Sequence, residues 1–268
     1  MHESSYLKMQ AFVDNYVNFA DHDLTKVLDV GSMIVVPNAL TYRTIFLDKN
    51  VEYVGLDVEP GLNVDYVPND PYSWEEIGDE SFNVIISGQA FEHVPYFWIT
   101  VAEMSRVLKP GGLLCLVFPS SGAVHRYPFD CWRFYPDSAQ AITQYAGLEL
   151  IEADTELSGF RKRVRTDWKE TLVIARKTST HDEVTSSRLR SIVASRPLTE
   201  FEDLKVKRGP AITQYENAVN ISIVVYGLKS IKRSIFSIWR HRLIPIARVI
   251  EKRLIRYDQK TGSIQNRS

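Results

Sequence analysis

The residues best suited to chemistry lie in one short segment, HRYPFDCWRFYPD, which runs from His125 to Asp137. It combines aromatic rings with arginines, aspartates and a histidine, and its prolines disfavour a helix or a strand interior. We predict a substrate-binding loop, because aromatic faces stack on ring-shaped compounds while charged groups bind hydroxyls, carboxylates or phosphates. The residues predicted to bind substrate are Arg126, Tyr127, Asp130, Trp132 and Arg133. In the alternative interpretation the aromatics cover the end of a sheet, and Arg133 pairs with Asp130 or Asp137.

Two histidines are candidates for a general base. His125 opens the segment, and His93 follows Glu92 in the sequence FEHV. A neutral imidazole titrates near the working pH and can accept a proton from a hydroxyl group. We favour His125 as this catalytic residue. The alternative for His93 is a structural histidine whose ring is hydrogen-bonded to nearby backbone.

Short apolar runs alternate with helix-like stretches between Lys26 and Lys177, which is typical of a mostly parallel sheet with helices on both faces. The sequence predicts an α/β domain with seven strands, preceded by a helix over residues 5–20. The third and shortest strand is expected in NVDYV, at 63–67. Helices are expected in YFWITVAEMSRVL and in PDSAQAITQYA, the latter ending at Gly147.

Ligands of such sheets bind beyond the carboxyl ends of the strands, where the strand order reverses. The first predicted strand ends in DVGS, with Asp29, Gly31 and Ser32. The second ends in GLD, where Asp57 stands at the position of an acid that binds the two ribose hydroxyls. These positions predict an adenosine-type ligand. A dinucleotide is disfavoured, because the first turn lacks the later glycines of that fingerprint.

Four motifs together resemble the class I S-adenosylmethionine-dependent methyltransferases, in particular the type-11-like group: VLDVGS, YVGLDVEPG, FNVIISGQAFEHV and EMSRVLKPGGLLCLVFPS. The resemblance covers about residues 20–177 and implies S-adenosylmethionine as the cofactor. It implies that Asp29, Gly31 and Ser32 cradle its methionine part. Asp57 would bind its ribose, and Val58 and Asp70 would lie near its adenine. Its sulfonium would be bordered by Ser87, Gly88 and Gln89. The first loop departs from the family, because Met33 and Val35 stand where further glycines are common.

The resemblance implies methyl transfer, and the aromatic segment favours the oxygen of a glycan or another small polar ring compound as acceptor. Similar segments occur in bacterial methyltransferases of surface-glycan pathways. N-methylation and a non-catalytic scaffold that keeps the fold are the alternatives. We expect no metal; in the alternative, Glu92, His93 and His125 hold a divalent cation, as a similar set does in the small-RNA 3′-end methyltransferases, with Gln89 in place of another acid.

Composition divides the 268 residues into two parts. Of the 32 Lys and Arg residues 17 lie after Lys177, but only 8 of the 33 Asp and Glu residues do, so residues 178–268 carry +9 and residues 1–177 carry −10. We predict a methyltransferase domain at 1–177, a linker at 178–220 and a basic amphipathic extension at 221–268, helical or β-α in structure.

The extension has three open interpretations: a contact within an oligomer or on the core, the first β-α unit of a further domain, or peripheral contact of residues 228–257 with an anionic membrane. Nucleic-acid binding is not expected, because no reader motif accompanies the charge. With no signal peptide or membrane span in the sequence, we expect a cytoplasmic location. Two cysteines, Cys115 and Cys131, are expected to be free thiols.

Overall fold

A computed structural model describes residues 2–21, 24–36, 39–155, 168–179, 181–195 and 210–211 of the chain. The chain divides into two compact units, Met1–Asp203 and Leu204–Ser268. The sheet and the helices that cover it belong to the first unit. The predicted basic extension at 221–268 lies outside the described residues.

A six-stranded sheet forms the centre of the first unit, with the order β2-β1-β3-β4-β6-β5. The strands are β1 (Thr25–Val30), β2 (Val51–Leu56), β3 (Phe82–Gly88), β4 (Leu108–Pro119), β5 (Glu149–Thr155) and β6 (Glu170–Arg176). The first four run parallel to one another, whereas β6 is antiparallel to both β4 and β5. The predicted class, a mostly parallel α/β sheet, is confirmed.

The number of strands differs from the prediction, because NVDYV does not form a seventh strand. This segment contributes one parallel bridge, between Tyr66 and Leu56. The amide of Tyr66 donates to Gly55 O, and its carbonyl accepts from the amide of Asp57. Asn63 has a positive φ of 70°, which is incompatible with extended pairing, so the ladder cannot extend in that direction.

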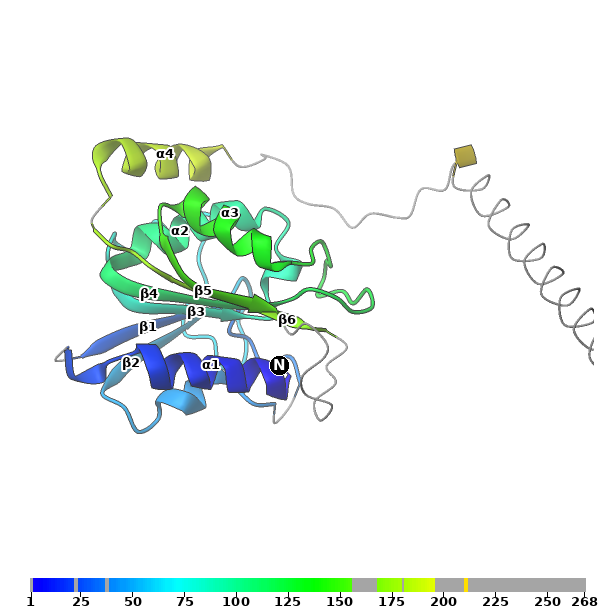
Figure 1. The fold of residues 1–268 in the computed structure, drawn as a ribbon, viewed down its shortest axis with the longest axis horizontal. Helices are drawn as coiled ribbons and strands as arrows, with labels where there is room; N and C mark the ends of the chain where they lie inside the picture. The colour runs from blue at the N-terminus through cyan, green and yellow to red at the C-terminus, as the bar shows by residue number, and fades with distance from the viewer. Residues whose placement is uncertain are drawn as a thin grey trace, which may run out of the picture. The chain divides into compact units, whose positions relative to one another are not determined.

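Helices cover both faces of the sheet, as predicted (Figure 1). Helix α1 (Glu3–Tyr16) lies on one face, while α2 (Phe97–Val107) and α3 (Pro136–Ala146) lie on the other. Two short 3-10 turns, η2 (Tyr42–Phe46) and η3 (Phe91–His93), follow β1 and β3. Gly147 ends α3 in the left-handed conformation, with a φ of 70°.

Two hydrophobic cores lie on opposite faces of the sheet, because successive strand residues point in opposite directions. Val84 and Ile86 of β3 pack in the core beneath α1, whereas Ile85 packs in the core beneath α2 and α3. This double burial explains the nearly continuous apolar runs of the sequence. Cys115 is buried in the α1 core, and both cysteines are free, as expected.

Helix α4 (Glu183–Ala194) lies within the segment 178–220 that was predicted to be a linker. Its buried residues Leu189 and Val193 pack with Ile99 and Ala102 of α2. The sequence did not predict this helix because the residues before Leu189 are polar. Only Leu189 and Val193, one turn apart, are buried against α2. In Figure 1, α4 forms an outer layer beyond α2 and α3.

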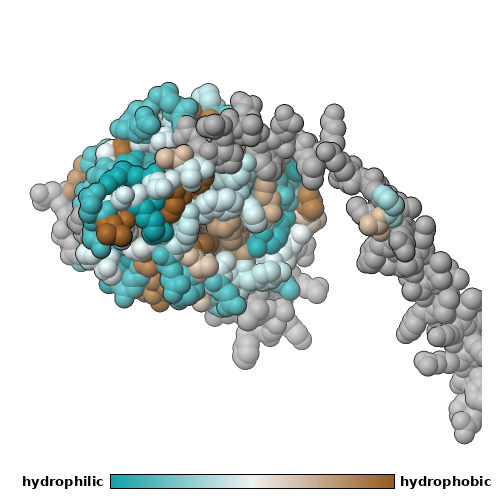
Figure 2. All heavy atoms as spheres, turned by 90° about the horizontal axis from the view of Figure 1, so that it is seen from above, coloured by the Kyte–Doolittle hydropathy of each residue, from teal (hydrophilic) through white to brown (hydrophobic). Residues whose placement is uncertain are grey.

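The surface of the described part shows no extended apolar area on the side drawn in Figure 2, where hydrophobic residues form separate groups among hydrophilic ones. None of the described helices has the length and apolar character needed to cross a membrane.

Candidate active site

Glycines bring the ends of β1 and β3 into direct contact. Gly31 has a positive φ of 81°, and a Cβ atom at this position would overlap the Cβ of Ala90. Gly88 similarly faces the hydroxyl of Tyr42, leaving no room for a side chain. Because β1, β2 and β3 are parallel, their carboxyl ends meet at one edge, where this fold binds its ligands. The predicted glycines therefore lie at the expected edge, and packing requires both.

Asp29 is a buried acid with one unused oxygen. Its Oδ2 accepts a hydrogen bond from the Tyr53 hydroxyl, while Oδ1 has no partner among the described residues. Burial raises the pKa of Asp29 to about 7, against the hydrogen bond from Tyr53. The Oδ1 atom can accept an N–H group, such as the ammonium group in the methionine part of the predicted cofactor.

Asp57 uses one carboxylate oxygen to hold the first loop and the other to bond the amide of the residue that follows it. Oδ2 accepts from the amide of Met33 at 2.9 Å, and Oδ1 accepts from the amide of Val58 at 2.8 Å. Each oxygen keeps a further lone pair, so the carboxylate can still bind ribose hydroxyls. Val58 is largely exposed, as a residue lying against a bound adenine would be before binding.

Three of the remaining predicted cofactor residues have internal partners, whereas Gln89 keeps a donor free of hydrogen bonds within the described chain. Ser32 Oγ donates to Asn63 O at 3.1 Å, and Ser87 Oγ donates to Val30 O at 2.7 Å. Asp70 Oδ1 accepts from the amide of Tyr72 at 2.8 Å. Gln89, with a φ of 57°, has a buried Nε2 without a partner in the described chain. Gln89 thus offers a donor at the end of β3.

A polar network lies beneath the first loop, and of its members the sequence indicated only Arg43, in NALTYR, as a residue that could compensate for the missing glycines. Asn63 Nδ2 donates to Ser32 O at 2.8 Å, and Arg43 Nε donates to Asn63 Oδ1 at 2.7 Å. The Arg43 guanidinium also lies 4.4 Å above the ring of Tyr53, the partner of Asp29. No local motif marks Asn63 or Tyr53, because their role depends on β2 and η2 meeting the loop in space.

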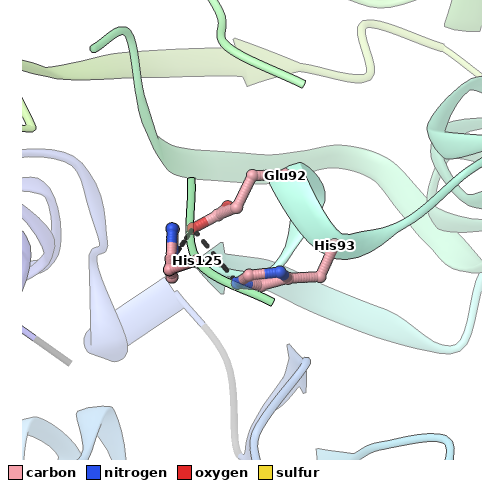
Figure 3. Close-up of side chains that lie close together, drawn as sticks. All are labelled: Glu92, His93 and His125. Atoms are coloured by element: carbon pink, nitrogen blue, oxygen red, sulfur yellow. Dashed lines mark ion pairs between the residues drawn. The ribbon is translucent and has the colours of Figure 1, made fainter. Parts of the chain in front are cut away.

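Glu92, His93 and His125 form a second group, which we call the acid–histidine cluster (Figure 3). His93 Nε2 lies 3.7 Å from Glu92 Oε1, and His125 Nε2 lies 4.0 Å from the same oxygen. The two imidazole rings are nearly perpendicular, with centroids 4.8 Å apart. The structure thus brings together both predicted bases, one from η3 and one from the loop after β4.

Burial dominates the electrostatics of this cluster. Glu92 is completely buried, and burial raises its pKa to about 7. Burial also lowers the pKa of His93, so its imidazole is held neutral. His93 Nδ1 lies 2.5 Å from the carbonyl oxygen of Phe129, which can only accept, so Nδ1 carries the proton and Nε2 faces the cluster. This contact matches the backbone hydrogen bond that the structural interpretation of His93 expects.

Three of the five predicted substrate residues fix the loop itself. Arg133 donates two hydrogen bonds to Asp130, at 2.5 and 2.8 Å, which is the pairing considered as the alternative. Desolvation by burial raises the pKa of Asp130, but the hydrogen bonds from Arg133 and from the His125 amide outweigh it, so the pKa is lowered. Trp132 Nε1 donates to Val94 O at 3.1 Å, and its ring contacts Phe97 edge-on.

Tyr127 and Arg126 are the predicted substrate residues whose side chains are exposed. Tyr127 is 58% exposed, and its ring centroid lies 6.1 Å from that of His93. Trp168, which the sequence did not single out, lies on the other side of the cluster with its ring centroid 4.5 Å from that of His125. A Cβ atom at Gly122 would overlap the Trp168 ring, so this glycine makes room for it.

Comparison with known proteins agrees with this architecture. Residues 40–116 match the model of a family described as a methyltransferase domain. Comparison with curated proteins gives no match.

Similar solved structures include a 1,6-didemethyltoxoflavin-N1-methyltransferase from Burkholderia thailandensis, 16% identical over 66% of this chain and 80% of that chain, with a TM-score of 0.49. A SAM-dependent methyltransferase from Methanosarcina mazei is 15% identical over 63% and 97% of the two chains, with a TM-score of 0.46. Another from Archaeoglobus fulgidus is 16% identical over 65% and 95%, with a TM-score of 0.43.

The domain match begins in the loop after β1 and ends within β4, so it includes the ends of β2 and β3 and the Glu92–His93 pair. The sheet order and the glycine contact at the ends of β1 and β3 fit the same class. The chain therefore contains a methyltransferase domain, for which S-adenosylmethionine is the methyl donor.

Proposed function

We propose that the enzyme methylates a hydroxyl oxygen of a glycan or another small, polar, ring-containing acceptor. The observation that carries this proposal is the exposed ring of Tyr127 beside the acid–histidine cluster. An aromatic face stacks on a sugar ring, and the cluster provides groups that bind a hydroxyl. Arg126, which is also exposed, adds a cation for a phosphate or carboxylate on the acceptor.

The methyl donor would be bound at the ends of β1, β2 and β3. Asp29 Oδ1 and Asp57 would bind its ammonium group and its ribose, and Gln89 Nε2 would provide a further donor. S-Adenosylmethionine supplies an activated methyl group on sulfur. The protein therefore has chiefly to hold an acceptor oxygen in line and to favour loss of its proton.

The segment from His125 to Asp137 is fixed by contacts on both sides of Tyr127. His125 N donates to Asp130 Oδ2 at 2.7 Å, and Arg133 holds the same carboxylate. Phe134 is buried against Phe118, with ring centroids 4.3 Å apart. A loop held in this way can position an acceptor with little ordering cost.

The test is a methyl-transfer screen of nucleotide-sugars and lipid-linked glycans, with product detection by mass spectrometry. For a true acceptor, Tyr127→Ala should raise KM by at least about 10-fold, the loss expected for one stacking contact of about 1.4 kcal/mol. Tyr145→Ala is the matched control, because Tyr145 lies at the far end of α3 and stacks with Arg188. Methylation restricted to nitrogen, or equal KM values for both variants, would contradict the proposal.

A further inference from the structure

The acid–histidine cluster contains a buried carboxyl group without a hydrogen-bond partner among the described residues. Glu92 is 0% exposed, and neither of its carboxylate oxygens has a hydrogen-bond partner among the residues that the structure describes. Leaving a carboxylate buried and unpaired costs several kcal/mol. Arg133 makes no hydrogen bond to Glu92: its two terminal nitrogens donate to Asp130 and to the carbonyls of Trp132 and Ala123, and its Nε has no partner among the described residues.

The histidines present lone pairs to this carboxylate. His93 holds its proton on Nδ1 through Phe129 O, which leaves the lone pair of Nε2 facing Glu92. His125 Nδ1 has no hydrogen-bond partner among the described residues, but it lies 3.5 Å from Asp130 Oδ2. The negative charge of Asp130 favours a proton on Nδ1, which again leaves Nε2 facing Glu92. In these tautomers, and with Glu92 ionised, none of the three groups donates a hydrogen to another.

We propose that Glu92, His93 and His125 bind one divalent transition-metal cation, with open coordination positions for an oxygen of the acceptor. The three ligand atoms lie within 4.8 Å of one another. Metal–ligand bonds of about 2.1 Å at tetrahedral or octahedral angles place neighbouring ligand atoms about 3.0–3.4 Å apart, so modest side-chain rotations bring all three onto one ion. Figure 3 shows Glu92 between the two rings.

The chemistry of the donors indicates the class of cation. Two imidazole nitrogens and one carboxylate, without a thiolate, suit Mn²⁺, Fe²⁺, Co²⁺ or Zn²⁺ better than Mg²⁺ or Ca²⁺, which prefer oxygen. Metal-binding histidines usually direct their second ring nitrogen at a carbonyl or carboxylate group that orients the ring. Here His93 Nδ1 contacts a backbone carbonyl, and His125 Nδ1 lies near a carboxylate. Arg133 in turn fixes that carboxylate.

Three protein ligands leave at least one position open, as in catalytic metal sites. An acceptor hydroxyl in this position would be held and made more acidic. This role of the cation rests on the proposed function, whereas the cation site itself does not. In this arrangement His93 and His125 are ligands, which replaces the sequence-based prediction that one of them is the general base and that no metal is used.

The test is calorimetric titration of Mn²⁺ and Co²⁺ into the full-length, chelator-treated and tag-free protein, with the visible spectrum of Co²⁺ as a second readout. We expect one ion per chain. Changes in outer-shell partners weaken metal sites by about 10–100-fold, so Asp130→Asn should fall in that range. Glu92→Gln and His125→Asn, which remove ligands, should weaken binding by more than about 100-fold and abolish the Co²⁺ spectrum.

His181→Asn is the matched control, because His181 is also partly buried but bonds Ser105 through its Nε2, 2.8 Å away. It should keep wild-type affinity. Thermal unfolding without metal shows whether each variant folds, and added Mn²⁺ should raise the Tm of wild type but not of His125→Asn. Absence of saturable binding by wild type, or unchanged binding by Glu92→Gln and His125→Asn, would overturn the cation site. Cation binding without methylation of any glycan would leave the site standing and contradict only the proposed acceptor.

Discussion

At the scale of single residues, Asp29 is unusual because it is buried beside a phenol and not beside a cation. Tyr53 donates to it, Asp57 raises its pKa further, and only Arg43 acts in the opposite electrostatic sense. The carboxyl group therefore holds its proton up to a pH of about 7, whereas in the unfolded chain it loses the proton near pH 4.

This difference predicts a pH dependence of stability. Between about pH 4 and pH 7 the folded state binds more protons at Asp29 than the unfolded state does, so the free energy of unfolding falls as pH rises. The loss attributable to Asp29 is at most about 4 kcal/mol, and Asp29→Asn should remove it. Urea unfolding at pH 5 and 7.5 measures the effect, with Asp14→Asn on the exposed side of α1 as control. Parallel profiles for wild type and Asp29→Asn would contradict the assignment.

Gly31 provides a second prediction at this scale. Gly31→Ala combines a positive φ with an overlap on Ala90, whereas Gly111→Ala has a φ of 78° and nothing within 4 Å of the added Cβ. The φ alone costs about 1–2 kcal/mol, and overpacking adds about 1–3 kcal/mol. We expect Gly31→Ala to be the more destabilising of the two in urea unfolding, and Ala90→Gly to restore only the packing part. Equal losses at the two glycines would show that the loops do not press on each other.

At the scale of elements, α4 is held to the domain by very few side chains. Leu189→Ala should lower the free energy of unfolding by about 2–4 kcal/mol, because its side chain is 2% exposed between α4 and α2. Val184→Ala, at a site 77% exposed on the same helix, should change it by less than about 0.5 kcal/mol. Chemical denaturation measures both. A Leu189→Ala loss as small as the Val184→Ala loss would indicate that α4 behaves as a linker.

The order and type of most elements could be predicted from periodicity, because strands buried on both faces and helices with one apolar face leave distinct patterns. The short strand at 63–67 could not be judged, since one bridge at Tyr66 and a ladder look alike in sequence. Helix α4 was missed because its polar composition resembles that of a linker.

The candidate site was predictable in position but not in detail. Strand ends indicated Asp29, Gly31 and Asp57, and the segment from His125 indicated the acceptor side. Whether Arg133 serves Asp130 or a substrate depends on side-chain geometry, which no spacing encodes. Trp168 and Asn63 enter the site from distant segments, so no local signal could mark them.

At the scale of the whole molecule, charge is divided between an acidic domain and a basic extension. Helix periodicity after Lys229 places Lys232, Arg233, Arg240 and Arg242 away from an apolar stripe. Contact of residues 228–257 with a membrane remains a prediction, since these residues lie outside the described part of the chain.

This prediction is tested by sedimenting the full-length protein with vesicles of anionic or neutral lipid. Each cation near an anionic surface contributes about 1 kcal/mol, so changing these four residues to glutamine should lower binding by at least about 100-fold. Binding should also fall with added salt. The charge-matched control is a variant in which four basic residues of the domain are changed to glutamine instead: Lys26, Lys49, Lys109 and Arg176. Equal sedimentation of both variants with anionic vesicles would favour the oligomer or core-contact interpretation.

The contact between Gly31 and Ala90 also bears on the kinetics of the enzyme. Ala90 immediately precedes the turn that carries Glu92 and His93, while Gly31 lies in the loop expected to close around the methyl donor. If the loop moves when the donor binds, its contact with Ala90 would shift the turn and thereby position Glu92 and His93 for the acceptor. We therefore expect ordered addition, with the donor binding first and the acceptor second. Initial-rate and product-inhibition patterns distinguish this from random addition, and Ala90→Gly should shift the pattern toward random.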